Sequence, residues 1–309
     1  MTICEFLKTD IRKPCDHYLK GGMCSRPKLF RCVEFVARFV PRLSHSAIQK
    51  FMRCPLMYYY SNIIGLQVRS ELHSDALRIG KRADELITGN DSSPECNPDS
   101  LWFVKSEAIF NAFIKLMTGF NVDNYTGQYE FLWQEDKHPS IKGFIDLHAN
   151  DNTHFIELKV GKNPNYYTNL FWQRSQLGTY FLSNPSYQYG IMWAIRVPDL
   201  KSTGQYKGES LTQYKDRCVA DMLKRPTWYF PGYNKDTNTF GIKFYRTEIN
   251  LDAIKKRFQM IAWQIQKCAK EGFWYANETQ CLFPFECDYK RVCETGVISE
   301  SIYEYREKK

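Results

Sequence analysis

Two carboxylates and an ammonium group are predicted to meet near the middle of this chain. In the segment FIELK, the alternation of a β-strand places Glu157 and Lys159 on one face. The segment GFID before it carries Asp146, and a short turn over Asn150–Asn152 separates the two strand-like runs. Residues 146 and 157 of such a hairpin lie roughly opposite each other, so we expect Asp146 beside Glu157.

This grouping suits the hydrolysis of a phosphodiester bond. Carboxylates hold one or two divalent ions, which polarise the scissile phosphate and lower the pKa of an attacking water. Lys159 would orient that water or offset charge that develops on the phosphate. Mg2+ or Mn2+ is the expected ion, because hard oxygen ligands favour hard cations. Taken alone, E-x-K on a strand is also explained by a cross-strand salt bridge on a solvated face.

Three motifs in series distinguish this chain from one with an isolated salt bridge. They are G-x-x-D at Gly143–Asp146, E-x-K at Glu157–Lys159 and Q-x-x-x-Y at Gln176–Tyr180. In this order they resemble the motifs of RecB-like nucleases in the PD-(D/E)xK superfamily. The resemblance implies an α/β (α+β) fold with a restriction-endonuclease-like core, in which helices flank a central mixed β-sheet.

The same resemblance implies roles for individual residues. Asp146 and Glu157 would bind the metal ion, the Leu158 carbonyl would add a ligand, and Lys159 would be catalytic. The last motif supplies two residues that lie four apart, and therefore on one face of a helix, where they would line the site and contact DNA. These residues are Gln176 and Tyr180.

The chain departs from the family at an earlier motif. RecB-like nucleases often carry G-x-x-x-H on a helix, and the histidine is a further metal ligand. Here Gly80 is followed four positions later by Asp84, in IGKRADELI. An Asp84 oxygen can bind Mg2+ or Mn2+ where the family has imidazole. The alternative is a charged residue on a solvated helix face, which would leave the metal count or preference open.

Three cysteines near the C-terminal end, Cys281, Cys287 and Cys293, follow C-x5-C-x5-C spacing. Cubane iron-sulfur clusters take four cysteine ligands, and the fourth can be remote in sequence. The segment SAIQKFMRCPLMYYY, which contains Cys54, resembles the helix ending in Cys-Pro of iron-sulfur members of the family, including the AddB helicase-nuclease and CRISPR-associated exonucleases. That resemblance makes Cys54 the fourth ligand of a 4Fe-4S cluster that ties the chain ends together. Zinc, which four thiolates also hold, is the competing metal.

A second set of cysteines falls in residues 1–40, which have little helical periodicity. Such a segment has little core of its own, and a metal staple is the simplest way to order it. We predict a small zinc-binding or similar module here, in which His17 can replace one thiolate, followed by the nuclease domain over residues 41–309. The alternative is a cysteine-containing extension packed on that domain. The candidate ligands are Cys4, Cys15, Cys24 and Cys32.

Hydrophobic spacing predicts the elements that position these residues. Apolar residues recur at helical spacing in some segments and alternate in others, in a mixed α and β order. A capping box from Ser46 to Gln49 is expected to begin a helix that ends before Pro55. The other predicted helices cover residues 75–88, 104–118, 166–183 and 250–270, and the predicted strands cover 140–149, 153–160, 189–197 and 240–249.

The composition is that of an ordinary globular protein. With 309 residues, of which 43% are hydrophobic, the chain can form one large domain or one domain with a small appendage. A net charge of +8 is compatible with a polyanionic partner, and some of the 16% aromatic residues can stack on unpaired bases, although most are expected in the core. No long apolar run or apolar leader is present, so we expect a cytoplasmic protein without membrane contact.

Three functions remain open on the sequence alone. The leading one is a Mg2+- or Mn2+-dependent DNA nuclease, an exonuclease acting on single strands or duplex ends, in DNA recombination, repair or processing. The second is a non-catalytic nucleic-acid-binding component that retains the nuclease fold, against which the intact Asp146, Glu157 and Lys159 argue. The third is an interaction subunit whose N-terminal module recruits a partner protein of a recombination or packaging complex.

Overall fold

The structure is a computed structural model of the chain, and it describes residues 43–90, 98–134, 140–169, 171–201, 203–282 and 286–306. The predicted module over residues 1–40 lies outside the described residues. Its four candidate ligands, Cys4, Cys15, Cys24 and Cys32, lie there with it.

The described chain divides into two compact units. Unit 1 takes the described residues up to Leu72, those between Gln134 and Ile141, and those from Lys255 onward. Unit 2 takes His73–Trp133 and Lys142–Ile254. The candidate carboxylates and lysine belong to unit 2, and the candidate iron-sulfur cysteines belong to unit 1.

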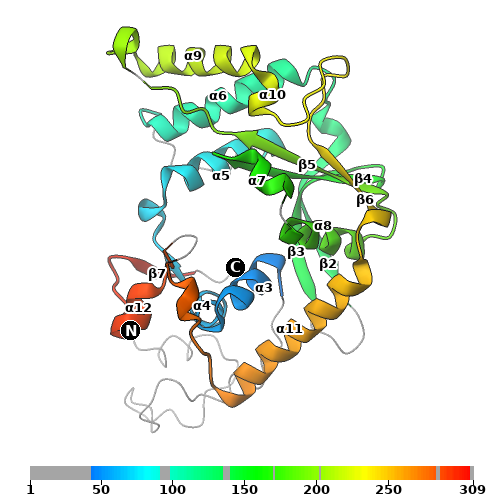
Figure 1. Cartoon of the computed structure of the whole chain (residues 1–309), viewed down its shortest axis with the longest axis vertical. Helices are drawn as coiled ribbons and strands as arrows, with labels where there is room; N and C mark the ends of the chain where they lie inside the picture. Colours follow the sequence, from blue (N-terminus) through cyan, green and yellow to red (C-terminus); the bar gives the residue numbers. More distant parts are fainter. Residues whose placement is uncertain are drawn as a thin grey trace. The chain divides into compact units, whose positions relative to one another are not determined.

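Unit 2 is built on a five-stranded sheet with the strand order β2-β3-β4-β5-β6 (Figure 1). Strands β4 and β5 run parallel, whereas β3 pairs with β4 and β5 with β6 in the antiparallel sense, so the sheet is mixed. The prediction of a mixed sheet flanked by helices is confirmed. The strands are β2 (Tyr125–Trp133), β3 (Ile141–Ala149), β4 (His154–Gly161), β5 (Tyr189–Arg196) and β6 (Ile242–Tyr245).

Helices cover both faces of this sheet. Alternation along β4 turns Ile156 and Leu158 into a core with helix α5, and we call this side the α5 face. It turns Phe155 the other way, where its ring packs 5.0 Å from that of Phe181 on α8, and we call this side the α8 face. The helices of unit 2 are α5 (Asp75–Thr88), α6 (Leu101–Leu116), α7 (Pro164–Asn169), α8 (Phe171–Ser183), α9 (Leu211–Lys224) and α10 (Pro226–Tyr229).

Unit 1 joins segments from the two ends of the described chain. Strand β1 (Leu66–Val68) pairs antiparallel with β7 (Tyr303–Tyr305). The Tyr289 hydroxyl donates to the Leu66 carbonyl at 2.7 Å, and the rings of Tyr60 and Tyr289 stack at 5.6 Å. The other main elements are helices α3 (His45–Arg53), α4 (Pro55–Tyr58), α11 (Leu251–Glu271, which begins in unit 2) and α12 (Lys290–Thr295), with a π-helix at Tyr59–Ile64.

Short 3-10 turns complete the described structure. They connect longer elements in both units, and several are a single turn long. They lie at Ser70–Leu72, Val122–Asn124, Gly204–Tyr206, Arg246–Glu248 and Glu278–Gln280.

Several helix ends differ from the prediction. Ser44, not Ser46, caps α3, because its side-chain oxygen accepts a hydrogen bond from Ala47 N at 3.1 Å. Ser46 therefore lies inside the first turn. Ser100 caps α6 in the same way, so this helix begins three residues before the predicted start at residue 104. Of the helix predicted over residues 166–183, the structure describes α7 up to Asn169 and α8 from Phe171 onward.

The strand predicted over residues 240–249 is shorter than expected, because only Ile242–Tyr245 pair with β5 before a 3-10 turn begins. Strand β2 and helix α9 are among the elements that were not predicted. Strand β2 lies at the edge of the sheet with Phe131 as its one buried side chain, so it lacks a clear apolar alternation. Helix α9 buries only a narrow stripe, which includes Tyr214 and Cys218.

Among the described residues, no helix has both the length and the apolar content that a bilayer crossing requires.

Gly241 provides a test of packing at the start of β6. Its φ is 102°, and an added Cβ would lie 2.6 Å from Trp193 Cδ1 and 2.8 Å from the Met192 oxygen. We expect Gly241→Ala to lower the free energy of unfolding by about 1–3 kcal/mol, because buried neighbours must move. Gly204→Ala is the control, since Gly204 has φ 61° but open space around it. Equal losses in thermal unfolding would show that backbone conformation alone limits position 241.

Candidate active site

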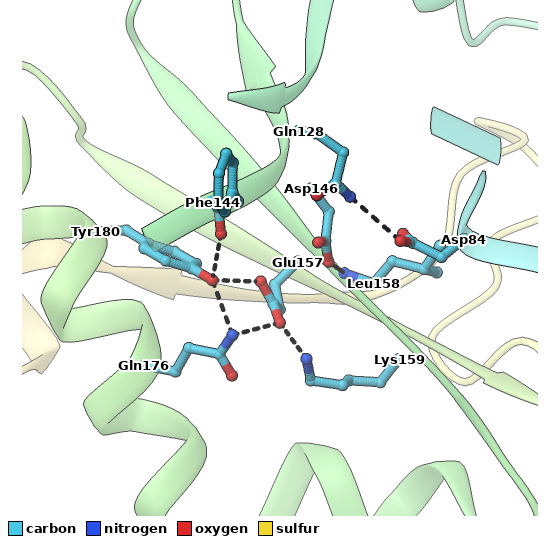
Figure 2. A network of polar contacts seen from close by, with 9 residues as sticks. All are labelled: Asp84, Gln128, Phe144, Asp146, Glu157, Leu158, Lys159, Gln176 and Tyr180. Atoms are coloured by element: carbon cyan, nitrogen blue, oxygen red, sulfur yellow. Dashed lines mark hydrogen bonds and ion pairs between the residues drawn. The ribbon is translucent and has the colours of Figure 1, made fainter. Parts of the chain in front are cut away.

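The hairpin of β3 and β4 opens where the predicted acidic residues lie. Leu147 pairs with Ile156, so the next step of the register sets Asp146 opposite Glu157. There the Leu158 N–H donates to Asp146 Oδ2 at 2.7 Å, so a side-chain carboxylate occupies a position between the strands. The structure therefore brings Asp146 and Glu157 together, as the hairpin predicted (Figure 2).

Glu157 is buried, with only 1% of its surface exposed. Three groups donate hydrogen bonds to its carboxylate. The Lys159 ammonium and Gln176 Nε2 (2.6 Å) share Oε1, and the Tyr180 hydroxyl lies 2.8 Å from Oε2. A buried carboxylate needs such donors, since desolvation without them is very unfavourable. The ion pair of Glu157 with Lys159 is therefore not a solvated surface salt bridge.

Helix α8 supplies two of these donors from one face. Gln176 and Tyr180 are four residues apart, and Gln176 Nε2 also donates to the Tyr180 hydroxyl at 2.8 Å. The Tyr180 hydroxyl lies 3.1 Å from the Phe144 carbonyl as well, and its single proton serves one acceptor at a time. Helix α8 thus fixes the position of the Glu157 carboxylate through two side-chain hydrogen bonds.

The packing around Gly143 explains why the first motif begins with glycine. A Cβ at this position would lie 2.7 Å from two atoms of the Phe131 ring. That ring is buried and packs edge-on to Tyr180 at 5.3 Å. Any side chain at Gly143 would press Phe131 toward the tyrosine that holds Glu157.

Asp84 reaches the same site from helix α5. Gln128 Nε2 donates to Asp84 Oδ2 at 3.2 Å, whereas Asp84 Oδ1 is buried without a hydrogen-bond partner among the described residues. Burial, and then the nearby Glu157 charge, raise the pKa of Asp84 to about 6. The side chain is thus turned into the site, unlike a charged residue on a solvated helix face.

Gln128 is a site residue that the sequence did not indicate. It belongs to the edge strand β2 and has φ 49°, in the left-handed region that residues other than glycine rarely adopt. Such strain tends to persist where it serves a function, and here it accompanies the contact with Asp84. No sequence signal pointed to Gln128, because β2 itself was not predicted.

The site holds more acidic than basic side chains. Burial, followed by the charges of Glu157 and Asp84, raises the pKa of Asp146 well above its usual value. For Lys159 burial acts to lower the pKa, but the surrounding carboxylates outweigh it and raise the pKa above the ordinary range. Lys159 therefore stays charged, and one ammonium faces three carboxylates.

The donor set fits a hard divalent cation. The side chains of Asp84, Asp146 and Glu157 offer carboxylate oxygens, and the buried Asp84 Oδ1 has no hydrogen-bond partner in the part of the chain that the structure describes. Within the described ranges, no three His, Cys, Asp or Glu side chains are already arranged to hold a metal ion. At this site the Lys159 ammonium lies against Glu157 Oε1, so a cation would have to share or displace that contact (Figure 2). The Leu158 carbonyl remains a predicted ligand.

The four candidate cluster cysteines belong to unit 1 and are thiols, not disulfides. Cys54 ends α3 in an extended conformation, and Pro55 begins α4 directly after it. Asn277 N donates to Cys54 Sγ at 3.4 Å, while Cys281 Sγ lies 3.9 Å from the Asn277 oxygen. Cys287 N donates to the Cys281 carbonyl at 2.8 Å. Backbone groups thus hold Cys54 and Cys281 on either side of one asparagine.

Cys293, on α12, completes this group. Burial raises the pKa of its thiol to about 11, and the charges of Cys287, Cys54 and Cys281 add to the effect. Burial also raises the pKa of Cys287. The four thiols thus belong to unit 1 and influence one another's charge, although no three His, Cys, Asp or Glu side chains of the described residues are already arranged to hold a metal ion. Sulfur donors of this kind fit an iron-sulfur cluster or zinc.

Comparison with known proteins found no family model and no curated protein that matches this chain.

Tyr180→Phe tests how strongly the donors hold Glu157. The variant removes the only hydroxyl that reaches Glu157 Oε2 within the described site, so we expect the free energy of unfolding to fall by about 1–3 kcal/mol. Thermal unfolding followed by circular dichroism measures the effect. Tyr245→Phe is the control, because that tyrosine is 49% exposed on β6. Unchanged stability of Tyr180→Phe alone would contradict the assigned contact.

Proposed function

We propose that this chain is a metal-dependent nuclease of the PD-(D/E)xK superfamily. The observation that carries the proposal is the meeting of Asp84, Asp146 and Glu157 with Lys159 where the hairpin opens. One buried Asp84 oxygen there has no hydrogen-bond partner within the described ranges. Buried carboxylates in excess over cations are unfavourable unless a bound cation completes the site.

In this proposal each side chain of the site has its own role. Asp84, Asp146 and Glu157, with the Leu158 carbonyl, hold Mg2+ or Mn2+, which when bound polarises the scissile phosphate and lowers the pKa of the attacking water. Lys159 remains protonated and offsets negative charge on the phosphate. Gln176 and Tyr180 keep Glu157 in place.

The substrate in this proposal is DNA, cut from single-stranded or duplex ends during recombination, repair or processing. The net charge of +8 and the series G-x-x-D, E-x-K and Q-x-x-x-Y support this choice, the latter through the resemblance to RecB-like nucleases. The mixed sheet with helices on both faces is compatible with a restriction-endonuclease-like core.

A protein that only binds nucleic acid would have little reason to keep this site. Basic surface residues suffice to grip phosphates. Buried acidic groups such as Asp146 and Glu157 repel phosphate and destabilise the fold, so their retention favours catalysis.

We propose further that Cys54, Cys281, Cys287 and Cys293 hold a 4Fe-4S cluster in unit 1. The contacts of Cys54 and Cys281 with Asn277 support this, together with the mutual influence of the thiols. A cluster here would be structural, because it would link segments separated by more than two hundred residues. Such a link reduces the conformational entropy of the unfolded chain.

Lys159→Ala tests the nuclease proposal. We expect cleavage of labelled DNA by the wild type only with Mg2+ or Mn2+, and a rate at least about 100-fold lower for the variant, since one charge-stabilising group is lost. Binding of DNA should persist. The matched control is Lys142→Ala, because Lys142 forms an ordinary cross-strand ion pair with Glu130, at 2.7 Å. Cleavage by Lys159→Ala at the wild-type rate would reject the assigned site.

Metal analysis of anaerobically purified protein tests the cluster. We expect a brown protein with about four irons per chain. Cys287→Ala should lose the iron and unfold at lower temperature, because the cluster supports unit 1. Cys268→Ser, on α11, should keep both properties. Zinc without iron in the purified protein would refute the iron-sulfur assignment.

A further inference from the structure

An arginine lies beside the candidate site on the same side of the sheet. In the parallel pair of β4 and β5, Lys159 is opposite Ala194 and Gly161 is opposite Arg196. Alternation therefore places Lys159, Gly161 and Arg196 together on the α8 face. Because Ala194 is small and Gly161 has no side chain, no bulky group of either strand stands between the two cations.

Arg196 is held in place by main-chain acceptors and by an indole ring. Its Nη1 donates to the Lys162 carbonyl at 2.5 Å and its Nε to the Trp228 carbonyl at 3.1 Å. Its guanidinium lies 3.9 Å from the centre of the Trp228 ring. Trp228, on α10, is nevertheless 52% exposed. The pair is thus an ordered cation and a large aromatic surface that faces solvent.

Tyr167 of α7 continues this surface toward the catalytic lysine. A Cβ at Gly161 would lie 2.5 Å from the Tyr167 hydroxyl oxygen, so the phenol lies directly over that glycine. The Lys159 charge acts to lower the pKa of Tyr167, although burial raises that pKa overall. Lys159, Tyr167 and Arg196 therefore lie around Gly161, at the end of β4.

We propose that Trp228 and Arg196 bind an unpaired nucleotide of the substrate strand next to the scissile phosphate. An exposed indole gains from stacking on a base, whatever the base, and the nearby Arg196 charge complements its phosphate. A duplex offers far less to this site, because its bases are already paired and stacked. The inference rests on the proposed nuclease function and adds to it a preference for single strands.

The test measures binding of a fluorescein-labelled single-stranded oligothymidylate by anisotropy, in the full-length Lys159→Ala chain so that the strand stays intact. Trp228→Ala should weaken binding about ten-fold, and Trp228→Phe much less, because phenylalanine still stacks. Both substitutions keep the Arg196 hydrogen bond, which goes to a main-chain oxygen. Binding of a blunt duplex of the same length should change little.

Trp263→Ala is the matched control. Trp263 is 60% exposed and has a lysine, Lys267, 5.6 Å from its ring, but it belongs to unit 1. We expect this variant to bind like the parent. Equal loss in both tryptophan variants, equal loss for duplex and single strand, or no loss in Trp228→Ala would each overturn the inference. A wild-type chain that cuts no DNA with Mg2+ or Mn2+ would instead reject the nuclease proposal itself.

Discussion

The structure of unit 2 depends on the burial of acidic side chains around a single ammonium group. Carboxylates leave water at a high cost in free energy, and the chain offsets part of this with donors from three elements. Glu157 is satisfied in this way by Lys159, Gln176 and Tyr180. Asp84 is not, since one of its oxygens is buried without a hydrogen-bond partner from any residue that the structure describes. The site therefore forms and still leaves one acceptor unfilled, as the proposed binding of a cation requires.

Local rules of structure are broken repeatedly around this centre. A carboxylate at Asp146 takes the place of a main-chain acceptor, Gln128 adopts a left-handed backbone conformation, and Gly143 leaves space for a neighbouring ring. Each departure costs some stability, and folds tend to retain such departures at functional sites. Left-handed residues other than glycine also occur away from the site, at Asn152 and Asn238, but the three departures around the carboxylates lie together.

In unit 1 the candidate metal ligands are cysteine sulfurs instead of carboxylates. Its small core combines segments from both ends of the described chain, and the β1–β7 pair alone is short. Cys54 and Cys281 approach each other through their shared contacts with Asn277, far from each other in sequence. A metal cluster at this point would add covalent constraint where apolar burial is limited.

Sequence periodicity by itself determined the elements with a strong apolar stripe. Helix α5 matches its predicted range, α11 differs by one residue at each end, and the β3–β4 hairpin forms as expected, because these depend on neighbours along the chain. The hairpin register in turn made the meeting of Asp146 and Glu157 predictable. Only the tertiary structure decided which way Asp84 turns, that Gln128 contacts it, and that Arg196 of β5 and Trp228 of α10 lie beside the end of β4. Those contacts join residues distant in sequence, and they exist only once sheet and helices have packed.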